Sequence, residues 1–246
     1  MSVNILRSLP ALAVLALLSS CAAGAKAEAP AGAMRALDTP AAAVNAAANS
    51  FPDPPAEPMQ AVPAAETRTA VLAGGCFWGV EGVFERLSGV IDVVSGYSGG
   101  EAADADYESV STGRTGHAES VKILYDPSKI AYGTLLKIFF HVAHDPTELN
   151  FQGPDVGTQY RTAVFYSDDA QKLAAEAYIA ILDKAGAYGK PIVTEVVPLE
   201  AFYPAEDYHQ DFMDNNPTYP YILYWDLPKV RQLASLYPQL VAPEYK

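Results

Sequence analysis

Cysteine, histidine and basic side chains are scarce in this sequence. Its 246 residues include two cysteines, Cys21 and Cys76, and four histidines. Two cysteines cannot form the set of disulfides that staples a small secreted domain, nor a zinc site of three or four thiolates. With 16 Lys and Arg against 29 Asp and Glu, the formal net charge is −13. So acidic a chain suits neither the phosphates of nucleic acid nor anionic lipid headgroups. We therefore expect no metal site and no nucleic-acid partner.

No early apolar run is long enough to span a bilayer as a helix. The run from Leu9 to Leu18 follows a lone cation, Arg7, which is typical of a secretory signal. It ends in Leu18-Ser-Ser-Cys21, which resembles the lipobox of bacterial lipoproteins. We predict a signal peptide at residues 1–20 and lipidation of Cys21; the alternative is an ordinary signal peptide with a chance cysteine. A diacyl anchor gives stable attachment, on the periplasmic side, and the non-acidic Ala22 favours the outer membrane.

Alanine and proline dominate the residues that follow. Seven prolines between residues 22 and 66 interrupt any helix that the alanines favour, and no apolar periodicity marks a buried face. We predict a disordered tether at residues 21–67, with a random-coil reach of roughly 40 Å. The folded domain is then expected at residues 68–246.

Short apolar runs and amphipathic patterns alternate beyond residue 67. The run Thr69–Ala73, ended by two glycines, predicts a buried strand and a turn. The mixture of strands and helices, without a regular βαβ repeat, favours an α+β fold: a two-layer, ferredoxin-like sandwich of a mostly antiparallel sheet with helices on one face. Long connections rich in Gly, Tyr and Pro are expected to be functional loops. Further predicted strands are Val90–Gly96, Glu119–Tyr125, Thr162–Tyr166 and Ile192–Pro198, and the predicted helices are Phe77–Leu87, Ile130–Val142 and Asp168–Ala185.

Cys76 has the surroundings of a reactive thiol. Two glycines before it let the backbone turn sharply and a ligand approach. The residue falls at the start of a predicted helix, where unpaired N–H groups and the helix dipole stabilise a thiolate. Phe77 and Trp78 follow and are suited to lining a small apolar pocket. These features favour a nucleophile over a buried structural cysteine.

The histidines do not define a second catalytic or metal-binding motif. His141 and His144 are one turn apart at a predicted helix end and, with Asp145, could be mistaken for a metal site. A third well-spaced ligand is missing, so we expect them to cap the helix C-terminus. Which histidine, if any, contacts Cys76 is left open by the sequence.

Six motifs in the folded region carry a family resemblance. In their order along the chain they resemble the signatures of the peptide methionine sulfoxide reductase A family, and they cover essentially all of residues 68–228. Any one match is weak, but six collinear matches leave little room for coincidence. They are Gly74-Gly-Cys-Phe-Trp-Gly79, Gly113-Arg-Thr-Gly-His-Ala-Glu119, Tyr125-Asp-Pro127, His144-Asp-Pro-Thr147, Gly153-Pro-Asp-Val-Gly-Thr-Gln-Tyr-Arg161 and Phe202-Tyr-Pro-Ala-Glu-Asp-Tyr-His-Gln210.

The resemblance implies a reaction and a role for each matched residue. The Cys76 thiolate attacks the sulfur of a methionine S-sulfoxide, and Glu119, as a protonated carboxyl, supplies the proton to the departing oxygen. The resemblance further implies that the sulfoxide oxygen and methyl group are bound by aromatic and acidic side chains. Those beside the oxygen are Tyr107, Asp155 and Tyr160, those beside the methyl are Phe77 and Trp78, and supporting candidates in the same motifs are Tyr97, Asp207, Tyr208 and His209.

The C-terminal tail departs from the family pattern. Reduction leaves Cys76 as a sulfenic acid, which a second thiol must resolve. Many family members have resolving cysteines in this tail, but residues 228–246 contain none. We therefore predict no prosthetic cofactor and an external reductant, either a thioredoxin-like protein or a small thiol. The alternative is that an unlipidated Cys21 reaches Cys76.

Two other functions remain open at this point. One is a cysteine hydrolase or transferase, although no Cys–His–Asn/Asp pattern is evident. The other is a non-catalytic lipoprotein that binds thioether or aromatic side chains. The leading hypothesis is an exported, membrane-anchored reductase that repairs oxidised proteins.

Overall fold

The computed structural model describes residues 50–55 and 66–245. The predicted signal peptide, Cys21 and most of the predicted tether lie outside the described residues. Within the two described ranges, no helix combines the length and the apolar character needed to cross a membrane.

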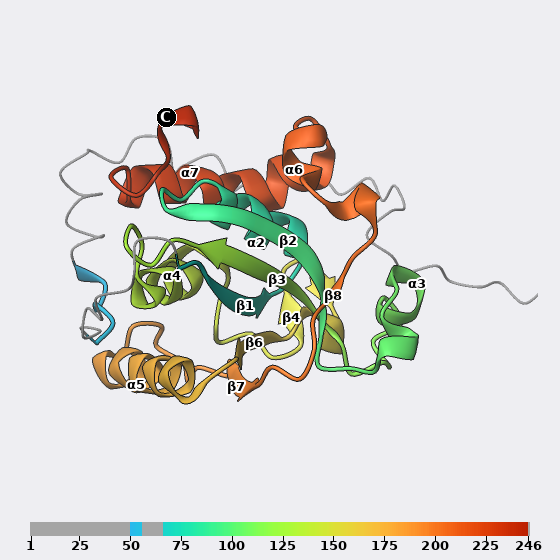
Figure 1. Cartoon of the computed structure of the whole chain (residues 1–246), viewed down its shortest axis with the longest axis horizontal. Helices are drawn as coiled ribbons and strands as arrows, with labels where there is room; N and C mark the ends of the chain where they lie inside the picture. Colours follow the sequence, from blue (N-terminus) through green and yellow to red (C-terminus); the bar gives the residue numbers. More distant parts are fainter. Residues whose placement is uncertain (1–49, 56–65, 246) are drawn as a thin grey trace, which may run out of the picture.

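A six-stranded sheet passes through the centre of the domain (Figure 1). Its strand order is β7-β6-β1-β3-β2-β8, and every neighbouring pair is antiparallel except β6 and β7. The strands β4 and β5 form a separate antiparallel hairpin. The bounds are β1 (Arg68–Gly74), β2 (Val90–Ser98), β3 (Ala118–Tyr125), β4 (Phe151–Gln152), β5 (Asp155–Val156), β6 (Thr162–Tyr166), β7 (Glu195–Pro198) and β8 (Tyr203–Pro204).

Helices of very different length accompany the sheet. In Figure 1, α7 runs along the top of the molecule and α5 along the bottom. The α-helices are α2 (Phe77–Glu85), α3 (Tyr107–Val110), α4 (Tyr132–Ile138), α5 (Asp169–Ala185), α6 (Phe212–Asn215) and α7 (Leu227–Leu236). The π-helical turns are η3 (Phe139–Ala143) and η6 (Ile222–Asp226), and the 3₁₀ turns are η2 (Ala102–Asp104), η4 (Thr158–Tyr160), η5 (Asp207–His209) and η7 (Pro243–Tyr245).

The alternation along β1 divides the core into two parts. Ala70 and Leu72 point to one face and pack into the large cluster that contains the buried side chains of α2, α4, α5 and α7. Val71 and Ala73 point to the other face, into a smaller cluster that the loop residue Leu199 covers. The predicted α+β class, with a mostly antiparallel sheet, is therefore confirmed.

Several predicted element ends were wrong by a few residues, for local reasons. The helix after Cys76 ends at Glu85 rather than Leu87, because Leu87 forms a β-bridge with Val241 near the C-terminus. The last of the predicted strands, β7, begins at Glu195 rather than Ile192. The N–H of Val193 donates to the carbonyl of Pro146 at 2.8 Å, outside the sheet, so the strand cannot start earlier.

The predicted helix Ile130–Val142 also differs from the observed one. It begins at Tyr132 and continues as the π-helical η3, after which His144 Nδ1 lies 2.9 Å from the carbonyl oxygen of Phe139. The capping prediction is thus confirmed for His144. It was wrong for His141, whose Nδ1 lies 2.5 Å from the Tyr237 hydroxyl. Among the described residues, no cluster of three potential metal ligands occurs.

Part of the predicted tether packs against the domain. The segment 50–55, drawn in blue, lies beside α4 and α5, at the opposite end of the molecule from α3 (Figure 1). Phe51 stacks on His141 with ring centroids 3.7 Å apart. The Tyr178 hydroxyl donates to the carbonyl of Pro52 at 2.8 Å, and Lys137 Nζ lies 2.6 Å from Asp53 Oδ1. These six residues therefore contact the domain through ring stacking, a hydrogen bond and an ion pair, which their linker-like composition gave no reason to expect.

Phe51→Ala is expected to destabilise the domain. The substitution removes the ring that stacks on His141 and contacts Tyr188, so the free energy of unfolding should fall by about 1–2 kcal/mol, as measured by urea denaturation. Leu173→Ala is the control, since Leu173 is 64% exposed on α5 and should change stability little. Equal stability of the Phe51 variant and the native protein would show that the segment does not contribute to the fold.

Candidate active site

Cys76 lies where β1 gives way to α2. It is the N-cap residue of that helix, is 3% exposed, and is a buried thiol. Gly75 makes the turn with φ of +92°, in the left-handed region that favours glycine. A methyl group on Gly75 would lie 2.6 Å from the Cβ of Gln152, so only glycine allows the β4–β5 hairpin to approach the turn this closely. The predicted strand, turn and helix start are all confirmed.

Glu119 reaches the same turn from the sheet. It lies on β3 and is 1% exposed, and its Oε2 accepts a hydrogen bond from the backbone N–H of Phe77 at 3.1 Å. Because Phe77 follows Cys76 directly, this bond fixes the carboxyl group beside the thiol. The strands β1 and β3 are neighbours in the sheet, and this pairing brings Glu119 close to the turn that carries Cys76.

Trp78 is held rigidly in the first turn of α2. Its indole Nε1–H donates to His209 Nδ1 at 3.2 Å, and its ring stacks on Phe212 at 3.8 Å. Burial lowers the pKa of His209 to about 4, although the charge of Glu206 opposes this, so the imidazole is neutral at neutral pH. The Phe77 ring packs against the same imidazole, with centroids 5.0 Å apart. The structure therefore brings both predicted aromatic residues together, through a histidine that the sequence offered only as a supporting candidate.

Asp155 belongs to the site through a tyrosine that the sequence analysis missed. The Tyr221 hydroxyl donates to Asp155 Oδ2. Burial raises the pKa of Tyr221 far above its ordinary value, and the electrostatic interaction with Cys76 is the next largest cause. Asp226 also contributes to that shift; it is fully buried, and burial raises its own pKa to about 6. No motif distinguishes Tyr221 among fifteen tyrosines, so the sequence held no signal that could have identified it.

Tyr107 packs against His209 as well. Its ring lies 4.6 Å from that of His209, and its backbone N–H donates to Glu206 at 2.9 Å. Glu206 also accepts from the Tyr97 hydroxyl at 2.9 Å. Burial raises the pKa of Glu206, but these hydrogen bonds outweigh it and lower the value overall, so the carboxylate is charged at neutral pH. Tyr160 is 5% exposed at the end of η4, in the loop between the β4–β5 hairpin and β6.

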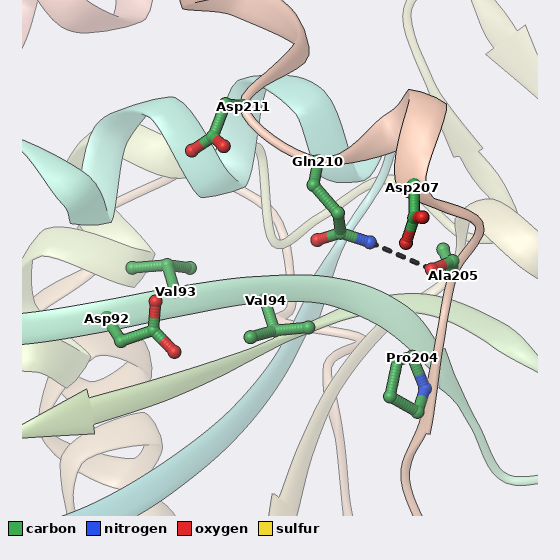
Figure 2. Close-up of a pocket in the computed structure, with 8 residues that line it drawn as sticks. All are labelled: Asp92, Val93, Val94, Pro204, Ala205, Asp207, Gln210 and Asp211. Carbon is green, nitrogen blue, oxygen red and sulfur yellow. Dashed lines mark hydrogen bonds between the residues drawn. The ribbon is translucent and has the colours of Figure 1, made fainter.

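Asp207, a supporting candidate, lines a different part of the surface from the residues around Cys76. It lines a hollow between β2 and residues 204–211, where the amide of Gln210 donates to the carbonyl of Ala205 at 3.0 Å (Figure 2). The other acidic residues of this hollow are Asp92 and Asp211. None of the residues predicted to act directly on the sulfoxide lines it. Tyr208, another supporting candidate, is 61% exposed, and its ring packs at a tilt of 45° against His209, with centroids 4.2 Å apart.

Gly75→Ala is expected to disable the site. The new Cβ adopts a strained backbone conformation and displaces Gln152, which moves the β4–β5 hairpin and Asp155 with it. We expect a loss of at least about tenfold in kcat/KM on a sulfoxide substrate. Gly186→Ala is the matched control, because it has φ of +63° but open space around it. It should lower stability by about 1 kcal/mol and leave kcat/KM unchanged. Equal kcat/KM losses in the two variants would contradict this account.

Comparison with known proteins places this arrangement in a family. The profile of the peptide methionine sulfoxide reductase family matches residues 68–239, which begin with the first residue of β1. The chain belongs to that family. It is similar to peptide methionine sulfoxide reductase MsrA 2 of Mesorhizobium japonicum, with 61% identity over 181 residues, 74% of this chain and 92% of that protein. MsrA 2 of Synechocystis is 56% identical over 171 residues, 70% of this chain and 80% of that one.

Solved structures of the family resemble the reductase domain. The reduced form of Mxr1 from Saccharomyces cerevisiae aligns with a TM-score of 0.58 and 34% identity, over 66% of this chain and 92% of that one. Methionine sulfoxide reductase A of Corynebacterium diphtheriae aligns with a TM-score of 0.55 and 33% identity, over 68% of this chain and 82% of that one. The predicted family and activity are confirmed: the chain is an oxidoreductase that reduces methionine sulfoxide. Neither the hydrolase nor the binding-protein alternative is favoured.

Proposed function

We propose that Cys76 and Glu119 carry out the reduction of peptide-bound and free methionine S-sulfoxide. The observation that carries this proposal is the hydrogen bond from the Phe77 N–H to Glu119, which places a buried carboxyl beside the thiol at the start of α2. The thiolate attacks the sulfoxide sulfur while a proton from Glu119 moves to the sulfoxide oxygen. The oxygen passes to Cys76, methionine leaves, and the cysteine sulfur loses the two electrons that the sulfoxide sulfur gains.

The aromatic side chains orient the sulfoxide in this mechanism. Phe77 and Trp78 provide an apolar surface for the methyl group, and the His209 bond prevents the indole ring from turning away. Tyr107 and Tyr160 donate to the sulfoxide oxygen, since a phenol combines a donor with an apolar ring. Asp155 and Tyr221 support this network through their hydrogen bond.

The oxidised enzyme requires a thiol from outside the chain. Besides Cys76, the sequence contains only Cys21, which lipidation would block. A thiol of the reductant condenses with the Cys76 sulfenic acid, releasing water and forming a mixed disulfide, and a second thiol then restores Cys76. We infer that a thioredoxin-like protein or a small thiol fills this role.

One assay tests the proposed reaction against its alternatives. The protein is incubated with a peptide containing methionine S-sulfoxide and with dithiothreitol, and the peptide mass is measured. Reduction removes one oxygen, about 16 Da. Peptide cleavage would point to a hydrolase and an unchanged peptide to a binding protein. A peptide with the R epimer is the control, and it should keep its oxygen.

We further propose that the chain is an exported lipoprotein that repairs oxidised proteins on the periplasmic side of the outer membrane. The lipobox-like ending at Cys21 and the predicted signal peptide at residues 1–20 support this proposal. Mass spectrometry of the native mature protein should find diacylated Cys21 at its N-terminus. An unmodified Cys21, or a Cys21–Cys76 disulfide after turnover, would contradict both the anchor and the external reductant.

The proposed architecture of the domain is a two-layer, ferredoxin-like sandwich. Its support is the element order β1-α2-β2-β3-α4-β6, combined with the strand order β6-β1-β3-β2 within the sheet. The strand β7 and the short β8 would then be additions at the two edges.

A further inference from the structure

The β4–β5 hairpin presents two different faces. Its register pairs Gln152 with Asp155 and Phe151 with Val156. Paired residues share a face, and successive residues point to opposite faces. Gln152 contacts the Gly75 turn and Asp155 binds Tyr221, so this pair faces the catalytic site. The other pair, Phe151 and Val156, therefore faces outward.

A third apolar side chain borders the outer face. A methyl group on Gly153 would lie 3.5 Å from the ring of Phe151 and 3.7 Å from the ring of Trp225, so both rings flank the hairpin turn. Val156 is 72% exposed and Trp225 is 39% exposed, while Phe151 is half-buried. We call these three residues, Phe151, Val156 and Trp225, the hairpin strip.

The hairpin strip is continuous with the site that takes the sulfoxide. Val156 directly follows Asp155 in the chain, and Trp225 lies four residues after Tyr221. Asp155 and Tyr221 are hydrogen-bonded to each other, and Tyr221 interacts with Cys76, so both exposed side chains belong to segments that reach the site. The surface around Tyr208, which is 61% exposed and packs against His209, is acidic instead: burial and then the nearby charges of Glu206, Asp106 and Glu108 raise the pKa of Tyr208. An apolar residue next to the oxidised methionine thus meets uncharged, apolar side chains on the hairpin strip, and acidic side chains around Tyr208.

We propose that the hairpin strip binds the polypeptide that flanks an oxidised methionine and gives the reductase a preference for apolar neighbours. This inference rests on the proposed chemistry at Cys76. Methionine in proteins is most often buried among apolar residues, so its sequence neighbours in an oxidised, unfolded segment are frequently apolar. Covering Val156 and Trp225 with such a neighbour removes apolar surface from water and strengthens binding of the peptide.

The test compares kcat/KM on three substrates with dithiothreitol as reductant, so that docking of a protein reductant does not contribute. They are a short peptide with leucine on both sides of methionine S-sulfoxide, the same peptide with serine, and N-acetyl-methionine S-sulfoxide. Val156→Ser should lower kcat/KM on the leucine peptide about fivefold, mainly through KM. It should leave the serine peptide and the small sulfoxide within twofold. Trp225→Ala should act in the same direction.

Leu173→Ser is the matched control, since Leu173 is about as exposed as Val156 but lies on α5. An equal kcat/KM for the leucine peptide in the native protein and the Val156 variant would overturn the proposal. So would a loss confined to assays with thioredoxin, which would assign the hairpin strip to the reductant. Retained reduction of the small sulfoxide shows that the chemistry at Cys76 is intact; its absence in the native protein would instead refute the proposed function.

Discussion

Cys76→Ser is expected to abolish the reduction of methionine S-sulfoxide, with a loss of at least about 10³-fold in kcat/KM. A serine hydroxyl is not ionised at neutral pH, even at the start of a helix, whereas a thiol there is readily converted to the nucleophilic thiolate. The measurement is the rate of oxygen loss from a sulfoxide peptide with dithiothreitol in excess.

The fold should survive this substitution. Cys76 is buried, and serine is nearly the same size and is a favoured N-cap residue for α2. The thermal unfolding midpoint of the variant should therefore stay close to that of the native protein. A well-folded serine variant with native activity would refute the assignment of the nucleophile.

Glu119→Gln is expected to slow the same reaction by about 10²- to 10³-fold in kcat. Glutamine keeps the shape of the side chain, and its amide oxygen still accepts from the Phe77 N–H that now binds Oε2. What it lacks is a proton that can be transferred to the sulfoxide oxygen. The measurement is a single turnover in the absence of reductant, which isolates the sulfoxide step from the later thiol steps.

Two comparisons separate proton donation from a positioning role for Glu119. Glu119→Asp keeps a carboxyl but withdraws it from Phe77, and it should retain more activity than the glutamine variant if the proton matters most. Reduction of the Cys76 sulfenic acid by dithiothreitol should proceed at the native rate in the glutamine variant. Native single-turnover kinetics in that variant would show that the carboxyl acts only through the backbone bond.

Local patterns predicted the parts of the fold that depend on neighbouring residues. The strand Thr162–Tyr166 was correct at both ends. The helix Asp168–Ala185 was one residue too long, because Asp168 is its N-cap and accepts from the Gln171 N–H at 2.8 Å. These elements carry their own signals: an apolar run, a capping aspartate and a glycine after the last turn.

Those local patterns could not predict contacts between segments that are distant in the sequence. The segment around Phe51 has the composition of a linker, and it packs through contacts with residues far along the chain, among them His141 and Tyr188. The helix α7 was not predicted either, since few of its residues are buried. A short-range pattern contains no information on which surface a segment will meet.

The candidate site also combines residues that the sequence could predict with residues that it could not. The turn at Cys76 could be predicted because its glycines, thiol and aromatic residues are adjacent in the sequence. Glu119 and Asp155 came only from the family resemblance, and Tyr221 came only from the structure, because sheet pairing and loop packing bring them to the turn. Their separation from Cys76 in sequence leaves no periodic pattern by which they could be recognised.

The mass of Cys76 after one turnover without reductant tests the central claim most directly. The protein is mixed with an equimolar sulfoxide peptide, treated with a sulfenic-acid trap, and digested for mass spectrometry. The account predicts one trapped adduct on Cys76 for each peptide reduced, and no adduct with an unoxidised peptide. Peptide reduction that leaves Cys76 as an unmodified thiol would contradict the proposed mechanism.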